Sequence, residues 1–222
     1  MARVTILTPL QKKFLLAFFS SPLGDKFFLG GGTALAEFYL QHRISQDLDL
    51  FTLDQSLDFG FVSAEINKIA RNLGFKTKHR VSSATFLQYI FQSKKRSLKV
   101  DVVKDVPIQF GKVKKIKGIW VSSLENIAVN KLLAIFGRTD AKDFIDLYFL
   151  LKKKKFSFEE LFKKAKKKDS GLNEFYLANM LAEVERLKHF PKTLKPFDKE
   201  DLVRFYLRLS RKMFKKIKPK YS

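Results

Sequence analysis

The sequence contains no cysteine, only three histidines and one tryptophan, and half as many acidic as basic residues. Without cysteine the chain cannot form a disulfide framework or a thiolate metal site. The longest mostly apolar runs, residues 14–19 and 145–151, are much shorter than the roughly 20 residues that cross a bilayer. The N-terminus also lacks the apolar segment of a secretory signal. We therefore expect no membrane span and a cytoplasmic location.

Positive charge is what the sequence has in excess. The chain of 222 residues carries 44 lysines and arginines against 22 acidic residues, which gives a formal net charge of +22. Such a charge raises the local concentration of polyanions, of which nucleic acid is the commonest. A solvated basic surface is the alternative explanation, because charge alone is poor evidence for a specific function. The charge indicates a partner but no reaction.

Turn signals and hydrophobic periodicity divide the sequence into two parts. Short strand patterns alternate with helical ones up to residue 121, and the periodicity is helical from residue 122 onward. We therefore predict an α+β domain over residues 1–121 and a helical domain over residues 122–222. Capping boxes start three helices, at Thr8 with Gln11, at Ser122 with Glu125 and at Ser157 with Glu160. The expected strands are residues 26–29, 47–51, 75–81, 85–91 and 98–103, the last three as an antiparallel meander, and helices are expected at 33–40 and 64–73.

A glycine-rich turn and two carboxylates form the clearest chemical pattern. One predicted strand ends in Gly30-Gly31-Gly32-Thr33, and the next carries Asp47 and Asp49. Side chains alternate along a strand, so both carboxylates lie on one face, where they repel each other unless a cation joins them. Glycines after a strand let backbone N–H groups approach phosphate oxygens. The pattern predicts a site for a triphosphate and its metal ions.

A third carboxylate, Asp101, lies in the middle of strand 98–103, where an unpaired charge is costly. The neighbouring Asp105 is the alternative. Two Mg²⁺ ions held by three carboxylates would bind a leaving pyrophosphate and activate an attacking hydroxyl, with Asp101 as the local base. No Gly-Lys-Ser/Thr follows the glycines, which excludes a Walker A loop, and the EF-hand pattern is absent. The predicted reaction is nucleotidyl transfer to a hydroxyl.

These motifs resemble a known family. Residues 31–35 (GGTAL), followed by Arg43-x-Ser45-x-Asp47-x-Asp49-Leu50-Phe51, are similar to the signature of the AbiEii/AbiGii toxins, within the DNA polymerase β-like nucleotidyltransferase superfamily. Residues 130–134, Arg138 and residues 142–148 resemble the helical motifs of that family. The resemblance covers about residues 26 to 150. It implies a polymerase β-like mixed sheet flanked by helices, a helical C-terminal half, Mg²⁺, an NTP substrate and a cognate antitoxin.

The resemblance also implies roles for single residues. Gly32 and Thr33 would contact phosphates, while Lys131 and Asp143 would complete the site. Arg43 has an alternative role as an ion-pair partner of the nearby aspartates, and Lys131 has one as a lysine that extends from an apolar helix face. The predicted catalytic residues are Asp47, Asp49, Asp101 and Lys131, the first three as metal ligands, and the predicted nucleotide-binding residues are Gly31, Gly32, Thr33, Arg43, Ser45, Lys131 and Asp143.

Some members of the family transfer nucleotides to the 3′ end of tRNA. We therefore predict a toxin that transfers a nucleotide from an NTP to an RNA 3′ end, with tRNA as the expected acceptor. Lysine-rich helices from Lys163 and from Arg208 to Lys220 are candidates for contacts with the RNA backbone. Two alternatives stay open: a basic nucleic-acid-binding protein with a vestigial site, and nucleotidyl transfer to a protein hydroxyl.

Overall fold

The computed structural model describes residues 5–93, 96–153 and 156–217. The chain divides into two compact units, Met1–Asn126 (unit 1) and Ile127–Ser222 (unit 2). The described part of unit 1 contains the sheet and the helices that cover it, and the described part of unit 2 contains helices alone. The domain boundary at residues 121 and 122 stays a prediction.

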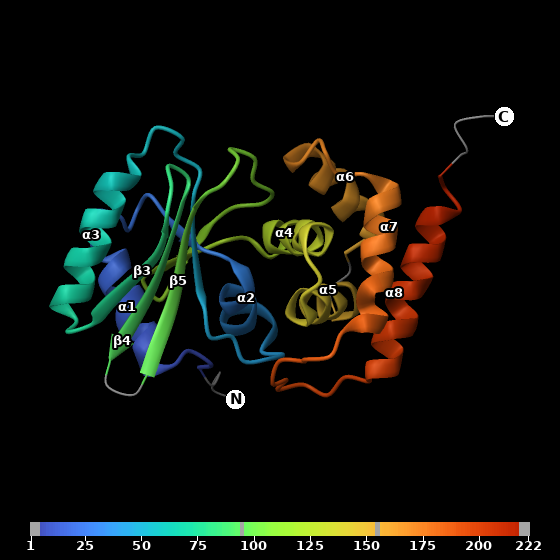
Figure 1. Ribbon diagram of the computed structural model, residues 1–222, viewed down its shortest axis with the longest axis horizontal. Coiled ribbons are helices and arrows are strands. Elements are labelled where there is room, and N and C mark those ends of the chain that lie inside the picture. Colours follow the sequence, from blue (N-terminus) through green and yellow to red (C-terminus); the bar gives the residue numbers. More distant parts are fainter. Residues whose placement is uncertain (1–4, 94–95, 154–155, 218–222) are drawn as a thin grey trace. The chain divides into compact units, whose positions relative to one another are not determined.

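A seven-stranded mixed sheet forms the centre of unit 1 (Figure 1). The strand order is β3-β4-β5-β2-β1-β7-β6, with β2–β5 and β1–β7 parallel and the other pairs antiparallel. The predicted antiparallel meander corresponds to β3, β4 and β5, whereas β6 and β7 are absent from the predicted strands. The strands are β1 (Phe28–Leu29), β2 (Leu48–Thr52), β3 (Lys76–Ser82), β4 (Phe86–Ser93), β5 (Arg96–Lys104), β6 (Lys114–Ile116) and β7 (Ile119–Val121).

One face of this sheet packs against helices α1 (Pro9–Phe19) and α3 (Phe59–Asn72). The ring of Phe14 in α1 lies 5.2 Å from that of Phe91 in β4, and the Tyr89 hydroxyl donates a hydrogen bond to Ser63 of α3. Every second residue of β2 and β5 is buried, including Leu48 and Val100. Each such side chain stabilises the fold by roughly 1.5–3 kcal/mol. The residues between them, which include the aspartates, therefore point to the opposite face.

Hydrogen-bonding side chains define where several helices begin. The capping box of α1 is confirmed, since the Gln11 N–H donates to Thr8 Oγ1 and the Thr8 N–H donates to Gln11 Oε1. The predicted box at Ser122 is wrong, because α4 (Leu124–Gly137) begins one residue later and the Asn126 N–H donates to Ser123 Oγ. Helix α3 begins five residues before the predicted start at residue 64, since the Asp58 carboxylate caps its first turn.

The helix predicted at residues 33–40 begins within the glycines. Helix α2 (Gly31–Ala34) continues into a π-helix, η1 (Leu35–Leu40), which ends at Gln41 with a φ of 49°. Glycine lacks the Cβ that would hinder the sharp turn from β1, so the helical backbone starts directly after the strand. The glycines thus form both the turn and the first helical residues. Helix α2 contacts β2, the strand that carries Asp49.

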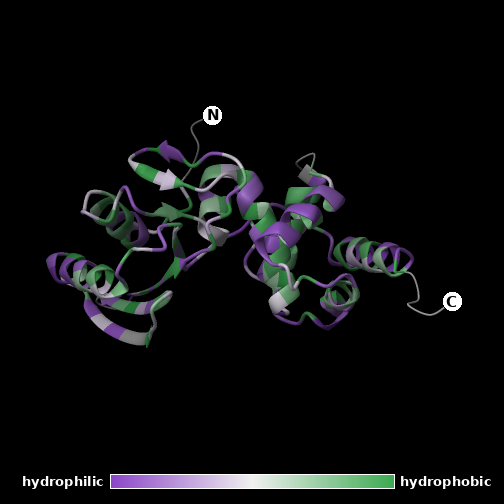
Figure 2. Cartoon of the chain, turned by 90° about the horizontal axis from the view of Figure 1, so that it is seen from above, coloured by the Kyte–Doolittle hydropathy of each residue, from purple (hydrophilic) through white to green (hydrophobic). Residues whose placement is uncertain are grey.

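Unit 2 consists of helices in the part of the chain that the structure describes, as predicted for the C-terminal half. The Tyr206 hydroxyl donates to the Phe144 carbonyl, and Ser210 Oγ donates to the Ala178 carbonyl, which ties α8 to α5 and α7. Hydrophilic and hydrophobic residues alternate along α8 in Figure 2, as in an amphipathic helix. Within the described ranges, no helix is long and apolar enough to cross a membrane. After α4 come α5 (Ala141–Lys153), α6 (Phe158–Lys168), α7 (Glu174–Ala182), η2 (Glu183–Arg186) and α8 (Lys199–Phe214).

Candidate active site

The glycine turn lies directly against β2. The Gly30 N–H donates to the Asp49 carbonyl at 2.9 Å, and Thr33 Oγ1 donates to the Asp47 carbonyl. Gly31 has a φ of +60°, and a Cβ on this residue would lie 1.8 Å from Asp49 Oδ2. A glycine is required at this position by both the backbone angle and the carboxylate. The turn and the Asp49 carboxylate are therefore direct neighbours.

Arg43 and Ser45 lie on the other side of the turn. A Cβ on Gly32 would be 2.2 Å from Arg43 Nη2 and 3.1 Å from Ser45 Oγ. The Arg43 side chain is buried, and its Nη1 donates to the Ile44 carbonyl at 3.0 Å. Gln11 of α1 holds the same segment, because its Nε2 donates to the Ser45 and Gln46 carbonyls, each at 3.0 Å. The structure thus brings the two side chains of the predicted motif to the glycines.

The parallel pairing of β2 with β5 places Asp49 opposite Asp101. Both side chains are on the face away from α1 and α3, because their neighbours in each strand are buried on the other side. Gln88 of β4 pairs with Asp101 in register and donates from Nε2 to Asp101 Oδ1 at 2.9 Å. Asp105 follows the end of β5, where its carboxylate accepts from the Val106 N–H. Of the two candidates, Asp101 is the one that faces Asp49.

Lys99 is the feature of this face that the motifs do not single out. Its Nζ lies 2.8 Å from Asp101 Oδ2 and 3.7 Å from Asp47 Oδ2. Burial would lower the pKa of Lys99, but the hydrogen bond and charge of Asp101, with the charges of the other two aspartates, together raise it. The same alternation that selects Asp101 also selects Lys99, two residues earlier in β5. The ammonium is thus a cation held by the predicted metal ligands.

The donor set of this face suits a hard divalent cation. Such ions bind carboxylate oxygens, with Mg²⁺ at about 2.0–2.1 Å in octahedral geometry. Among the described residues, no three acidic or histidine side chains are close enough together to hold a metal ion as they stand. The carboxylates of Asp47 and Asp101 instead share the ammonium of Lys99. The carboxylates of Asp47, Asp49 and Asp101 are suitable metal ligands, and they have to move closer together to bind one ion.

Lys131 and Asp143 form a cluster within unit 2. Lys131 Nζ lies 2.7 Å from both Asp143 Oδ1 and Asp146 Oδ2, and Arg138 donates to Asp143 Oδ2 at 2.8 Å. Both carboxylates are fully buried. Burial would raise the pKa of Asp143, but the charge of Lys131 and the hydrogen bond from Arg138 lower it. The network neutralises buried charge, and a role for Lys131 and Asp143 in nucleotide binding stays a prediction.

Comparison with solved structures identifies the fold. JHP933 of Helicobacter pylori superimposes with a TM-score of 0.56 at 21% identity, covering 93% of this chain and 90% of that one. MenT4, a nucleotidyltransferase toxin of Mycobacterium tuberculosis H37Rv, gives a TM-score of 0.56 at 14% identity, covering 91% of this chain and 82% of that one. The predicted polymerase β-like nucleotidyltransferase fold is confirmed.

Sequence comparison identifies the family. An uncharacterized protein of Aquifex aeolicus, aq_aa25, is 31% identical over 167 residues, which are 71% of this chain and 73% of that protein. The sequence model described as "Nucleotidyl transferase AbiEii toxin, Type IV TA system" matches residues 13–216. Nucleotidyltransferases of this kind use NTP substrates and divalent metals, and a toxin of such a system implies a cognate antitoxin. With its glycine turn, its facing aspartates and a match over nearly its whole length, the chain belongs to the AbiEii nucleotidyltransferase toxin family.

Proposed function

We propose that this toxin transfers a nucleotide from an NTP to the 3′ end of an RNA, with tRNA as the acceptor. The observation that carries the proposal is the register of β2 and β5, which places Asp49 and Asp101 opposite each other beside the glycine turn. This pairing unites carboxylates 52 positions apart in the sequence with a turn that has no side chains to exclude a phosphate. An acceptor in tRNA also implies that the toxin acts in the cytoplasm.

In the proposed reaction, the RNA 3′ oxygen attacks the α-phosphorus of the NTP and pyrophosphate leaves in line. Asp47, Asp49 and Asp101 would hold two Mg²⁺ ions, which supply charge neutralisation and a lowered pKa of the attacking hydroxyl. Asp101, whose Oδ1 already accepts from Gln88, would take the hydroxyl proton. The Gly31 and Gly32 backbone and the Thr33 hydroxyl would face the phosphates. Each of these residues acts by position or charge, as phosphoryl-type transfer requires.

Arg43 and Ser45 would complete the nucleotide site of unit 1, and the resemblance to the family extends nucleotide binding to Lys131 and Asp143 of unit 2. The Arg43 guanidinium beside Gly32 is suited to a phosphate oxygen, because its planar donors match that geometry. Ser45 presents its hydroxyl to the same glycine. Lys131 would supply positive charge to the triphosphate, and Asp143, with its pKa lowered, would stay ionised and orient that lysine.

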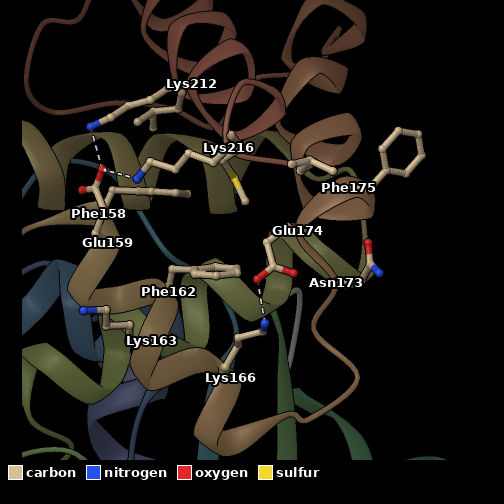
Figure 3. A pocket seen from close by; sticks show the side chains of 13 residues that line it. Phe158, Glu159, Phe162, Lys163, Lys166, Asn173, Glu174, Phe175, Lys212 and Lys216 are labelled. Atoms are coloured by element: carbon tan, nitrogen blue, oxygen red, sulfur yellow. Dashed lines mark hydrogen bonds and ion pairs between the residues drawn. The ribbon is translucent and has the colours of Figure 1, made fainter. Parts of the chain in front are cut away.

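The acceptor RNA would be held by the lysine-rich helices of unit 2. Helices α6 and α8 border a cavity of about 530 Å³ whose walls include rings of phenylalanine and the stems of lysines (Figure 3). Its rim carries Lys163, Lys166, Lys212 and Lys216, against two acidic residues, Glu159 and Glu174. This excess of positive charge supports a polyanionic partner. Lys218 and Lys220, also predicted for this contact, lie outside the described residues.

The proposal is tested by incubating the purified protein with Mg²⁺, each of the four labelled NTPs and bulk tRNA. We expect label on tRNA with at least one NTP, and its loss in D49N, which preserves the size of the side chain. Label on the protein itself would favour transfer to a protein hydroxyl. If no RNA or protein is labelled and D49N is as harmless to cells as the native toxin, the site is vestigial and the proposal is wrong.

A further inference from the structure

Lys99 occupies the space between two carboxylates that the proposed function assigns to metal ions. It lies in β5 on the same face as Asp101, and its ammonium reaches across to Asp47, which precedes β2. The contact is not a loose surface pair: Lys99 is about one-third exposed and the Asp101 side chain is 14% exposed. The second oxygen of Asp101 is held by Gln88. Both oxygens of Asp101 are therefore engaged.

A divalent cation cannot share this arrangement. The ammonium lies 2.8 Å from Asp101 Oδ2 and 3.7 Å from Asp47 Oδ2, whereas Mg²⁺ binds oxygen at about 2.0–2.1 Å. A metal ion that bridges these two carboxylates would come within contact distance of the ammonium, and two cations so close repel each other strongly. Metal binding at these oxygens therefore requires the ammonium to leave.

We propose that Lys99 is an internal counter-cation that competes with divalent metal for Asp47 and Asp101, and that the phosphates of a bound NTP take up its ammonium when the metal enters. Before loading, the lysine relieves the repulsion among the three carboxylates. After loading, it neutralises part of the triphosphate next to the glycine turn. The inference rests on the proposed function only in taking the aspartates as metal ligands, and it does not depend on the acceptor.

The proposal makes metal and NTP binding cooperative. Without NTP, the metal has to displace a cation whose anionic partners, among the described residues, are these aspartates themselves, so the affinity is low. With NTP, the released ammonium gains a phosphate, so each ligand strengthens the binding of the other by the same factor. A lysine that only stabilised the sheet would produce no such coupling. Cooperativity is therefore the readout that separates the two roles.

The experiment measures Mn²⁺ binding by the full chain from the electron paramagnetic resonance signal of free Mn²⁺. The variants are K99M, which keeps the stem and removes the charge, K99R, which keeps the charge, and K76M, which removes a lysine charge from an exposed position at the start of β3. We expect K99M to bind Mn²⁺ about 10- to 100-fold more tightly than the native protein, and K99R and K76M to differ from it by less than about 3-fold. A non-hydrolysable NTP analogue should strengthen Mn²⁺ binding by the native protein more than by K99M.

Equal or weaker Mn²⁺ binding by K99M than by the native protein would overturn the proposal, as would an increase in K76M of the same size. The absence of Mn²⁺ binding in all variants would overturn it together with the metal assignment. Because no RNA is present, failure of the tRNA acceptor leaves these measurements unaffected. Conversely, tRNA labelling with unchanged K99M binding would reject the role of Lys99 alone.

Discussion

Substitution of Gly31 by alanine tests whether the glycine turn positions the Asp49 carboxylate. The new Cβ would lie 1.8 Å from Asp49 Oδ2, and real Cβ atoms essentially never approach a neighbour within 3.0 Å. The carboxylate therefore has to move by about 1 Å, and a misplacement of that size costs about 100-fold in rate at a reacting centre. Alanine at a φ of +60° also costs about 1–2 kcal/mol of stability. We expect G31A to lose about 100-fold in kcat/KM for nucleotide transfer.

Gly74 provides the matched control, because it has a φ of +70° and no atom lies within 4 Å of the position that a Cβ would take. G74A should lose a similar free energy of unfolding, measured by urea denaturation, and keep native activity. The comparison separates the backbone strain, which both variants share, from the contact with Asp49, which only G31A makes. If G31A transfers nucleotides as fast as G74A, the turn does not position the carboxylate and the reasoning is refuted.

Two further predictions concern ion pairs in unit 2. K131M leaves Asp143 and Asp146 buried without their shared ammonium, so the free energy of unfolding should fall by about 3–5 kcal/mol. The control K142M removes a half-exposed ion pair and should change the free energy of unfolding by less than about 1 kcal/mol. Similar urea midpoints for the two variants would contradict the prediction. The hydrogen bond from Lys212 lowers the pKa of Glu159 from 4.5 to about 2, so its ionised form stabilises the fold above pH 4.5 and this contribution is lost as the pH falls toward 2. Solvent screening limits the contribution to about 1 kcal/mol, because the side chain is 41% exposed. The native protein should therefore exceed E159Q in unfolding free energy at pH 6 and approach it near pH 2.5, whereas a constant difference would show that the pair is not linked to pH.

The local patterns of the sequence predict much of the candidate site. Period-two alternation predicts that the Asp49 side chain lies on the face of its strand opposite Leu48 and Leu50, and the structure agrees. The glycine turn is also where its residues predict it, since a left-handed φ and a close carboxylate permit no side chain at Gly31. These features depend on neighbouring residues or on one strand, and such information is present in a short stretch of sequence.

Other features depend on which segments meet, and local patterns do not contain that information. The parallel pairing of β2 with β5 places two strands side by side that are separated by the whole of α3, β3 and β4. The sequence also does not reveal where the Lys99 ammonium lies, because a lysine in a strand is ordinarily a solvated residue. Only the folded structure shows the ion pair between Lys99 and Asp47, the residue that precedes β2.

The first residue of a helix is a third feature that the sequence predicts only approximately. Serines at positions 122 and 123 both suit a cap, and the choice between them depends on the residue that ends β7 and turns into α4. Gly60 within the first turn of α3 obscures the helical periodicity, although Asp58 is a good N-cap. The sequence narrows such boundaries to a few residues, and the tertiary contacts select one.

The parallel pairing of β2 with β5 also determines when a newly made chain can complete its acidic face. Synthesis proceeds from the N-terminus, so the glycine turn and Asp49 emerge from the ribosome while the strand that carries Asp101 is still to be translated. The hairpin of β3 and β4 has to emerge in between, and β5 then inserts beside β2. A chain that stops before β5 therefore keeps Asp47 and Asp49 but lacks Asp101 and the strand that pairs with β2 on this side.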